Sequence, residues 1–293
     1  MTSEAGTAAA RRVERVVSPF HTYEGAGFPV RRPFPTGELP FLDPFLMVDQ
    51  VGPVDLAPGE AKGAPPHPHR GFATIQYVIA GDIANADSRG HRAVVRAGGV
   101  QWLTAGSGIV HEALPTEEFL AAGGRQHLLQ IWVNLPARHK WTEPASRNAD
   151  AADLPVVTTP DGAHLTVIAG TTHGARGPFA SVTPVLVVHA RLAAGGRAAF
   201  TAPAGHNAAV YAMTGAARVG DVPLPDGHLA ALDRDGERFN VHADGGPAEV
   251  LVLAGEPIGE PVARSGPFVM NTAAELRQAE KDFALGRMGR MDG

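Results

Sequence analysis

The chain has 293 residues, a formal net charge of −5 and no cysteine. This composition excludes disulfides and thiolate metal sites, and the lack of a basic stripe argues against direct nucleic-acid binding. We interpret the one basic cluster, Arg11, Arg12 and Arg15, as a solvated N-terminal tail. The N-terminal segment lacks the apolar core of a secretory signal, and no apolar run is long enough to cross a membrane, so we expect a cytoplasmic protein.

Short apolar runs rich in Val, Ile and Leu recur along the chain between frequent glycines and prolines. The clearest runs are Thr74–Gly81, His127–Pro136, Pro184–Leu192, Ala208–Gly215 and Ala248–Pro257. Short strands bounded by Gly/Pro turns are typical of an all-β barrel or sandwich. We therefore predict an all-β fold.

One helix is predicted near the C-terminus. Thr272 and Glu275 have the spacing of a capping box, and Leu276, Ala279 and Phe283 would lie on one face of a helix that begins there. We expect this apolar face to pack on the wall of a barrel.

The two halves of the chain resemble each other weakly. The segments Tyr77–Asp82 and Tyr211–Ala216 place a tyrosine and a glycine at the same offset, and each half closes with a buried apolar strand. We interpret this as a duplication of one β-barrel, with a boundary near the polar segment Lys140–Pro155. The predicted domains are 1–142 and 143–293, the second ending in the helix.

Two of the 13 histidines are flanked by prolines just before an apolar strand. In an extended segment, His67 and His69 point to the same face, so both imidazoles can reach one metal ion. Pro66 and Pro68 restrict the segment to extended conformations, which lowers the entropy cost of assembling a site. The alternative is a proline-rich loop with incidental histidines.

A third ligand has to come from elsewhere in the chain. The segment Gln101–Pro115 offers His111 at the end of an apolar run that follows a Gly-Ser-Gly turn, and Glu112 comes directly after it. Surface exposure explains five of the other histidines, which lie in or beside turns or polar stretches: His139, His164, His173, His228 and His242.

Five segments in chain order resemble the pirin family of the cupin superfamily: Phe41–Gln50, His67–Gly81, Gly98–Pro115, Leu128–Pro136 and Gly255–Thr272. The combination of HPHRGF, QWLTAGSGIVH and GPFVMNT is highly specific. The resemblance covers most of the chain. It implies two cupin barrels in tandem with a C-terminal helix, and one metal site in the N-terminal barrel.

In pirins, the metal site consists of three histidines and a glutamate, usually with iron. The resemblance carries the histidines over to His67, His69 and His111, and it implies one divalent ion, Fe(II) first, with Zn, Ni, Cu, Mn or Co as alternatives. In the second half, Thr201 and Pro203 stand where the His-x-His pair stands, so we expect no metal there.

The glutamate departs from the family pattern. The family has it two residues after the third histidine, where this chain has Ala113, and the glutamate common after HRGF is Ala73 here. Strand alternation predicts that Glu112 points away from the face of His111. A β-bulge at residues 112–113 would turn it inward. In that geometry Glu112 is our candidate catalytic base.

The resemblance implies two classes of function. Several pirins are regarded as quercetin 2,3-dioxygenases, in which a metal binds the 3-hydroxyl of a flavonol and O₂ opens the central ring with loss of carbon monoxide. Others resemble redox- or metal-responsive regulatory proteins that bind partner proteins, and a degenerate pirin without metal is a third alternative. An apolar, open pocket leading to the histidines would favour the enzyme and a flavonol-like substrate, whereas a closed, charged mouth would favour the regulatory protein.

Overall fold

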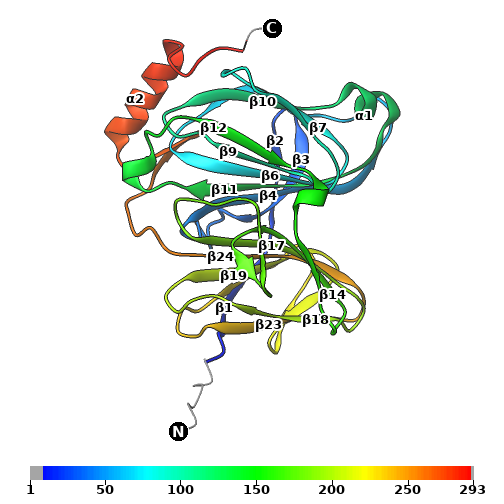
Figure 1. Ribbon diagram of the computed structural model, residues 1–293. Helices are drawn as coiled ribbons and strands as arrows, with labels where there is room; N and C mark the ends of the chain where they lie inside the picture. Colours follow the sequence, from blue (N-terminus) through cyan, green and yellow to red (C-terminus); the bar gives the residue numbers. More distant parts are fainter. Residues whose placement is uncertain (1–8, 292–293) are drawn as a thin grey trace. The chain divides into compact units, whose positions relative to one another are not determined.

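The structure is a computed structural model that describes residues 9–291. Contacts divide the chain into two compact units, both built mainly of β-strands (Figure 1). The first barrel comprises Phe20–Leu154 and the C-terminal stretch from Ile258, and the second barrel comprises Pro155–Pro257 and the N-terminal stretch up to Pro19. Within the described residues, no helix is long and apolar enough to span a membrane.

The first barrel contains a seven-stranded and a four-stranded sheet. The strands of the large sheet are β2 (Phe20–Glu24), β3 (Phe28–Phe34), β4 (Phe45–Leu56), β6 (Phe72–Ala80), β9 (Val100–Thr104), β11 (Gly124–Asn134) and β12 (Ala145–Ala149). The strands of the small sheet are β5 (Ala64–His69), β7 (Ile83–Asp87), β8 (Arg92–Val95) and β10 (Ile109–Pro115). The sheet orders are β12-β9-β6-β11-β4-β3-β2 and β5-β10-β7-β8.

Several short elements complete the first barrel. They are α1 (Glu117–Ala122), η1 (Ala137–His139), η2 (Ala151–Asp153), the hairpin of β25 (Ala263–Ser265) and β26 (Phe268–Met270), and α2 (Ala273–Ala284).

The second barrel has the same plan. Its large sheet contains β1 (Val13–Val17), β13 (Val156–Thr158), β14 (Ala163–Ala169), β17 (Val185–Leu192), β19 (Asn207–Thr214), β22 (Leu229–Leu232) and β24 (Ala248–Gly255). Its smaller pieces are β15 (Thr171–Thr172), β16 (Ala175–Arg176), β18 (Arg197–Thr201), β20 (Ala217–Val219), β21 (Val222–Leu224) and β23 (Arg238–Ala243). The orders are β1-β22-β19-β24-β17-β14-β13 and β18-β23-β20-β21.

The strand orders of the two barrels correspond one to one. The run β9-β6-β11-β4-β3 matches β22-β19-β24-β17-β14, and β5-β10-β7-β8 matches β18-β23-β20-β21. Tyr77 of β6 lies opposite Leu129 of β11, as Tyr211 of β19 lies opposite Leu251 of β24. The repeated tyrosines therefore occupy equivalent positions, and the predicted all-β fold with two barrels is confirmed.

The division of the chain differs from the predicted one, 1–142 and 143–293. Residues Ala145–Ala149, which we expected in a strand-poor boundary, form β12 and pair with β9. The C-terminal stretch returns to the first barrel. The reason is its apolar side chains, because Leu276 and Ala279 of α2 are buried in one cluster with Val110 of β10.

Helix α2 begins as the sequence predicts. Thr272 and Glu275 form the capping box, each side chain bonding the backbone of the other. Two of the three residues predicted on the apolar face, Leu276 and Ala279, are buried, whereas Phe283 is 41% exposed. The apolar contact of the helix therefore ends before Phe283, although Asp282 in its third turn is also buried.

The interpretation of the basic N-terminal cluster as a solvated tail is wrong for Arg11. Its side chain is buried within the second barrel. The guanidinium donates hydrogen bonds to the backbone carbonyls of Ala202, Pro203, His206 and Asp233. These carbonyls replace water as acceptors for a group that presents five N–H donors.

A buried ion pair ties α2 to the residue after β5. Arg70 Nη1 lies 2.9 Å from Asp282 Oδ2, and the two side chains are 4% and 10% exposed. Arg287 also contacts Asp282, but its side chain is 57% exposed.

We expect Asp282→Asn to lower the free energy of unfolding by about 3 kcal/mol or more, because it leaves a buried guanidinium without its counter-charge. Arg287→Gln removes a solvent-screened partner of the same carboxylate and should cost less than about 1 kcal/mol. Urea unfolding followed by circular dichroism measures both losses. Equal losses would show that the buried pair has no special role.

Candidate metal centre

Three histidines converge in the interior of the first barrel. Strand β5 supplies His67 and His69 from alternate positions, and β10 supplies His111 directly opposite His67. The Nε2 atoms of His67 and His69 are 3.2 Å apart. The ring centre of His111 lies 4.4 Å from that of His67 and 4.8 Å from that of His69. The structure thus brings together the three residues that the sequence singled out.

The ligand atoms of these histidines fit a single metal ion. One nitrogen from each side chain lies within 4.8 Å of the other two. Three such atoms share a point no more than about 2.8 Å from each, which is 4.8 Å divided by √3. Bonds from imidazole nitrogen to zinc are about 2.0–2.1 Å long. Small ring rotations would therefore bring all three nitrogens to bonding distance.

Hydrogen bonds at the far side of the rings orient two of these ligands. The Nδ1 atom of His67 is 2.7 Å from the carbonyl oxygen of Pro65, and that of His69 is 3.4 Å from the carbonyl oxygen of Pro267. A carbonyl only accepts, so this geometry assigns the proton to Nδ1 and leaves the lone pair on Nε2. The buried Nε2 of His111 has no hydrogen-bond partner. A buried, unpaired nitrogen beside two oriented ligands suits a metal site.

Burial lowers the pKa of all three imidazoles. The pKa values of His69 and His111 fall well below 6.5, first because the rings are desolvated and second because charges on the neighbouring imidazoles would repel. The pKa of His67 is lowered by burial as well, against a smaller opposing effect of the Pro65 carbonyl. At neutral pH the cluster is therefore uncharged, which is the form that binds metal.

The same shifts predict how the stability of the metal-free protein depends on pH. Below pH 6.5 the unfolded chain binds protons at these histidines that the folded protein does not. The free energy of unfolding should therefore fall as the pH decreases from about 6.5, and level off above it. Urea titrations of EDTA-treated protein between pH 5 and 8 measure this slope. The slope should shrink in His111→Gln, and an unchanged slope would assign it to other groups.

A cavity of about 550 Å³ opens in front of the cluster. Alternate residues of β11 (Gln126, Leu128, Gln130 and Trp132) and of β4 (Met47, Asp49 and Val51) form much of its wall, since strand side chains alternate between faces. The lining is largely apolar. The volume lies within the range of small-molecule sites, about 300–1,000 Å³.

Ala113, not Glu112, faces this cavity. Strand β10 keeps an unbroken register with β7 from His111 to Pro115, so alternation places Ala113 on the side of His111. The register shift between β10 and β5 comes from an extra residue on β5. Ala113 lines the cavity, whereas Glu112 is half-buried outside it. The geometry in which a bulge at residues 112–113 turns Glu112 inward is not the one observed.

The backbone that follows strand β5 is fixed by its close contact with strand β26. Gly71 has a φ of +88°, and a Cβ there would lie 1.9 Å from the carbonyl oxygen of Val269 in β26. Lys140 is buried beside this contact, and its Nζ donates to the carbonyls of Gly71 and Val269 and to Asn134 Oδ1 at 2.6–3.0 Å. Burial lowers the pKa of Lys140 to about 8.

Charged groups gather on one side of the cavity. Arg32 binds both carboxylate oxygens of Asp49 at 2.6 Å, and it also contacts Glu24. The guanidinium of Arg264 stacks over the ring of Trp132, with Cζ 4.7 Å from the ring centre.

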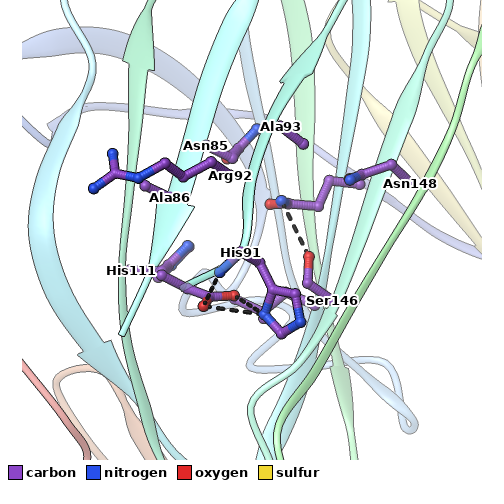
Figure 2. A pocket seen from close by; sticks show the side chains of 11 residues that line it. Asn85, Ala86, His91, Arg92, Ala93, His111, Ser146 and Asn148 are labelled. Carbon is purple, nitrogen blue, oxygen red and sulfur yellow. Dashed lines mark hydrogen bonds and ion pairs between the residues drawn. The ribbon is translucent and has the colours of Figure 1, made fainter. Parts of the chain in front are cut away.

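A smaller cavity of about 120 Å³ lies beside His111, which lines both (Figure 2). Most of the residues that line it are polar. Among them, His91 Nδ1 lies 3.1 Å from the Asp87 carboxylate, and Ser146 Oγ accepts a hydrogen bond from Gln101. This volume suits a few water molecules rather than an organic ligand.

The second barrel presents no comparable ligands at the equivalent strands. The buried residues of β18, Ala198 and Phe200, pack with Phe239 and Val241 of β23 in one apolar cluster. Thr201, at the end of β18, is exposed.

The strand order, the barrel interior and the placement of the histidines together define a protein with two cupin barrels. A cluster of three histidines, two buried and one half-buried, lies in the first barrel. The family model Pirin matches residues 27–133, and the model Pirin C-terminal cupin domain matches residues 187–289. The chain belongs to the pirin family, as the sequence motifs predicted.

Similar proteins cover nearly the whole chain. A Pseudomonas aeruginosa protein with the provisional name quercetin 2,3-dioxygenase PA2418 is 41% identical, over 90% of this chain and 93% of its own. The Arabidopsis thaliana pirin-like protein At1g50590 is 37% identical over 91% and 86%, respectively. The crystal structure of a quercetin 2,3-dioxygenase from Acinetobacter baumannii superposes with a TM-score of 0.92 at 35% identity, covering 97% of this chain and 100% of that one.

Proposed function

We propose that this protein is a metal-dependent dioxygenase of the quercetin 2,3-dioxygenase type, acting on flavonol-like hydroxy-ketones. The observation that carries the proposal is a cluster of three neutral histidines, two of them buried, that opens into a largely apolar cavity of about 550 Å³. This cavity favours the enzyme over the metal-responsive regulatory protein, for which we expected a closed mouth ringed by charge. The names of the related proteins support the same reading.

His67, His69 and His111 would hold one divalent ion, and we propose Fe(II). Imidazole also suits Zn, Ni and Cu, and three neutral ligands leave positions open for a chelating substrate. The bound ion would supply Lewis-acid and redox chemistry for a substrate hydroxyl and O₂.

The other residues of the cavity would bind and orient the substrate. The ring of Trp132 lies 5.3 Å from that of His69, so a flat ligand that reaches the histidines passes along its face or edge. Gln76 and Gln130 place side-chain amides in the wall, where they can hydrogen-bond to hydroxyl or carbonyl groups of a ligand. Ala113 supplies no base for the substrate hydroxyl, so we expect a slow enzyme.

The test is turnover of quercetin by protein reconstituted separately with Fe(II), Ni(II) and Zn(II). The proposal expects quercetin loss that requires O₂ and the metal and that releases carbon monoxide in equal amount. Metal binding without any such turnover across a panel of flavonols would overturn the enzymatic function. Failure to bind any of the three ions would favour a pirin that works without metal.

A further inference from the structure

The rim of the large cavity carries a cation whose neighbouring carboxylates are already engaged. Arg264 of β25 lines the cavity and is exposed to it. The acidic groups whose charges act on it are Asp49 and Glu24. Both of these are bound by Arg32, Asp49 through two hydrogen bonds. One N–H of Arg264 Nη2 is directed at Met47 Sδ at 3.9 Å. The guanidinium presents five N–H donors, so others are left for an acidic group of a ligand.

Arg264 is linked to the histidines through one aromatic ring. Its Cζ lies 4.7 Å from the ring centre of Trp132, which is 5.3 Å from the ring centre of His69. The two separations add to about 10 Å, the greatest distance between the guanidinium carbon and that imidazole. Because this distance is a maximum and the hydrogen bonds at its two ends take up part of it, the hydroxyl and the carboxylate of the ligand have to lie close together, as on adjacent carbons of an aromatic ring.

The histidine end of the cavity has no carboxylate ligand, and Glu24, the carboxylate whose charge acts on His67, is paired with Arg32. The ligands at this end are three neutral imidazoles, and Ala113 occupies the cavity wall where a carboxylate would offset the charge of a dication. A site with a bound dication and Arg264 would favour a ligand that brings its own negative charge, because opposite charges attract strongly in a partly desolvated cavity.

We propose that the cavity selects planar aromatic hydroxy acids, with the ligand carboxylate on Arg264 and the ligand hydroxyl toward His67, His69 and His111. Guanidinium groups match carboxylates through two parallel hydrogen bonds, which gives this end its selectivity. The inference rests on the proposed function in that the cavity is the substrate site.

Calorimetry with two naphthalene probes tests the proposed selectivity for a carboxylate. The compound 3-hydroxy-2-naphthoate has its hydroxyl and carboxylate on adjacent carbons of two fused rings, and 2-naphthol is the same body without the carboxylate. We expect the wild-type protein, both metal-free and loaded with Zn(II), to bind the acid at least about 10-fold more tightly, the range of a charge-assisted hydrogen bond.

Variants assign the preference to one residue. Arg264→Gln should weaken binding of the acid about 10- to 100-fold and leave 2-naphthol within about twofold. Lys62→Gln is the matched control, because Lys62 is the other cation lining the cavity, and it should leave the ratio unchanged. Circular dichroism confirms that each variant is folded.

Equal binding of the two probes by the wild-type protein, no binding of either, or a preference that survives in Arg264→Gln would overturn the inference. These measurements use no turnover, so they fail independently of the dioxygenase. Turnover of neutral flavonols without a carboxylate preference would leave the proposed function standing and sink this inference. A carboxylate preference without dioxygenase activity would support this inference and overturn the proposed function.

Discussion

Replacing His69 by alanine is expected to abolish stoichiometric metal binding. His69 is buried with its ring within 4.8 Å of both other imidazoles, and its loss leaves two neutral ligands. We expect at least about 100-fold weaker binding, because even loss of a residue that only supports a ligand costs about 10- to 100-fold. Metal analysis of protein purified without added metal, and titration with Zn(II), measure the effect.

The control for this variant is His164→Ala, an exposed histidine of the second barrel. It should leave the metal content unchanged. The wild-type chain should hold one ion rather than two, because the inward residues of β18 and β23 are apolar. Retention of the ion in His69→Ala would place the metal elsewhere.

Restoring a carboxylate at position 113 is expected to have the largest effect on catalysis. Ala113 lines the cavity on the face of His111, so Ala113→Glu would place a charged ligand and a base beside the substrate. Metal binding should tighten, since an anionic ligand is added. Any flavonol turnover should rise by about 10²- to 10⁴-fold, the usual contribution of general-base catalysis.

Two further variants separate the effect of the carboxylate's charge from the effect of its position in the chain. Ala113→Gln adds the same length without charge or basicity and should give neither gain. Glu112→Gln should leave metal content and turnover unchanged, because Glu112 lies outside the cavity. A loss of metal in Glu112→Gln, with no gain in Ala113→Glu, would mean that the two side chains exchange faces in solution.

The pair of His67 and His69 could be predicted because it depends on local geometry, whereas His111 was assigned through the resemblance to pirins. The alternate spacing of His67 and His69 fixes their common face whichever strand lies beside them. Local spacing is not enough to predict the orientation of Glu112, because it depends on the register of β10 against both neighbouring strands. Only the pairing with β7 shows that β10 is regular and that the extra residue belongs to β5.

The cavity wall was predictable in part. Alternation along β11 predicts that Leu128, Gln130 and Trp132 share one face of the strand. It does not predict which face of the strand lines the site. No pattern in the sequence predicted that Arg264 lines the cavity, because its position depends on how a hairpin near residue 265 returns to the first barrel. Arg11 was misjudged for a similar reason: its acceptors are backbone carbonyls some 200 residues away in the sequence, which no local pattern reveals.

Neither barrel is a continuous segment of the chain, and this affects the order of events during synthesis. The second barrel needs β1 from the start of the chain and nothing beyond Pro257. The first barrel also needs residues made after Pro257, because Pro267 and Asp282 contact His69 and Arg70. A ribosome-bound chain therefore completes the barrel without the histidine cluster first, since segments fold as their contacts become available. The contacts of Pro267 with His69 and of Asp282 with Arg70 are therefore among the last to form.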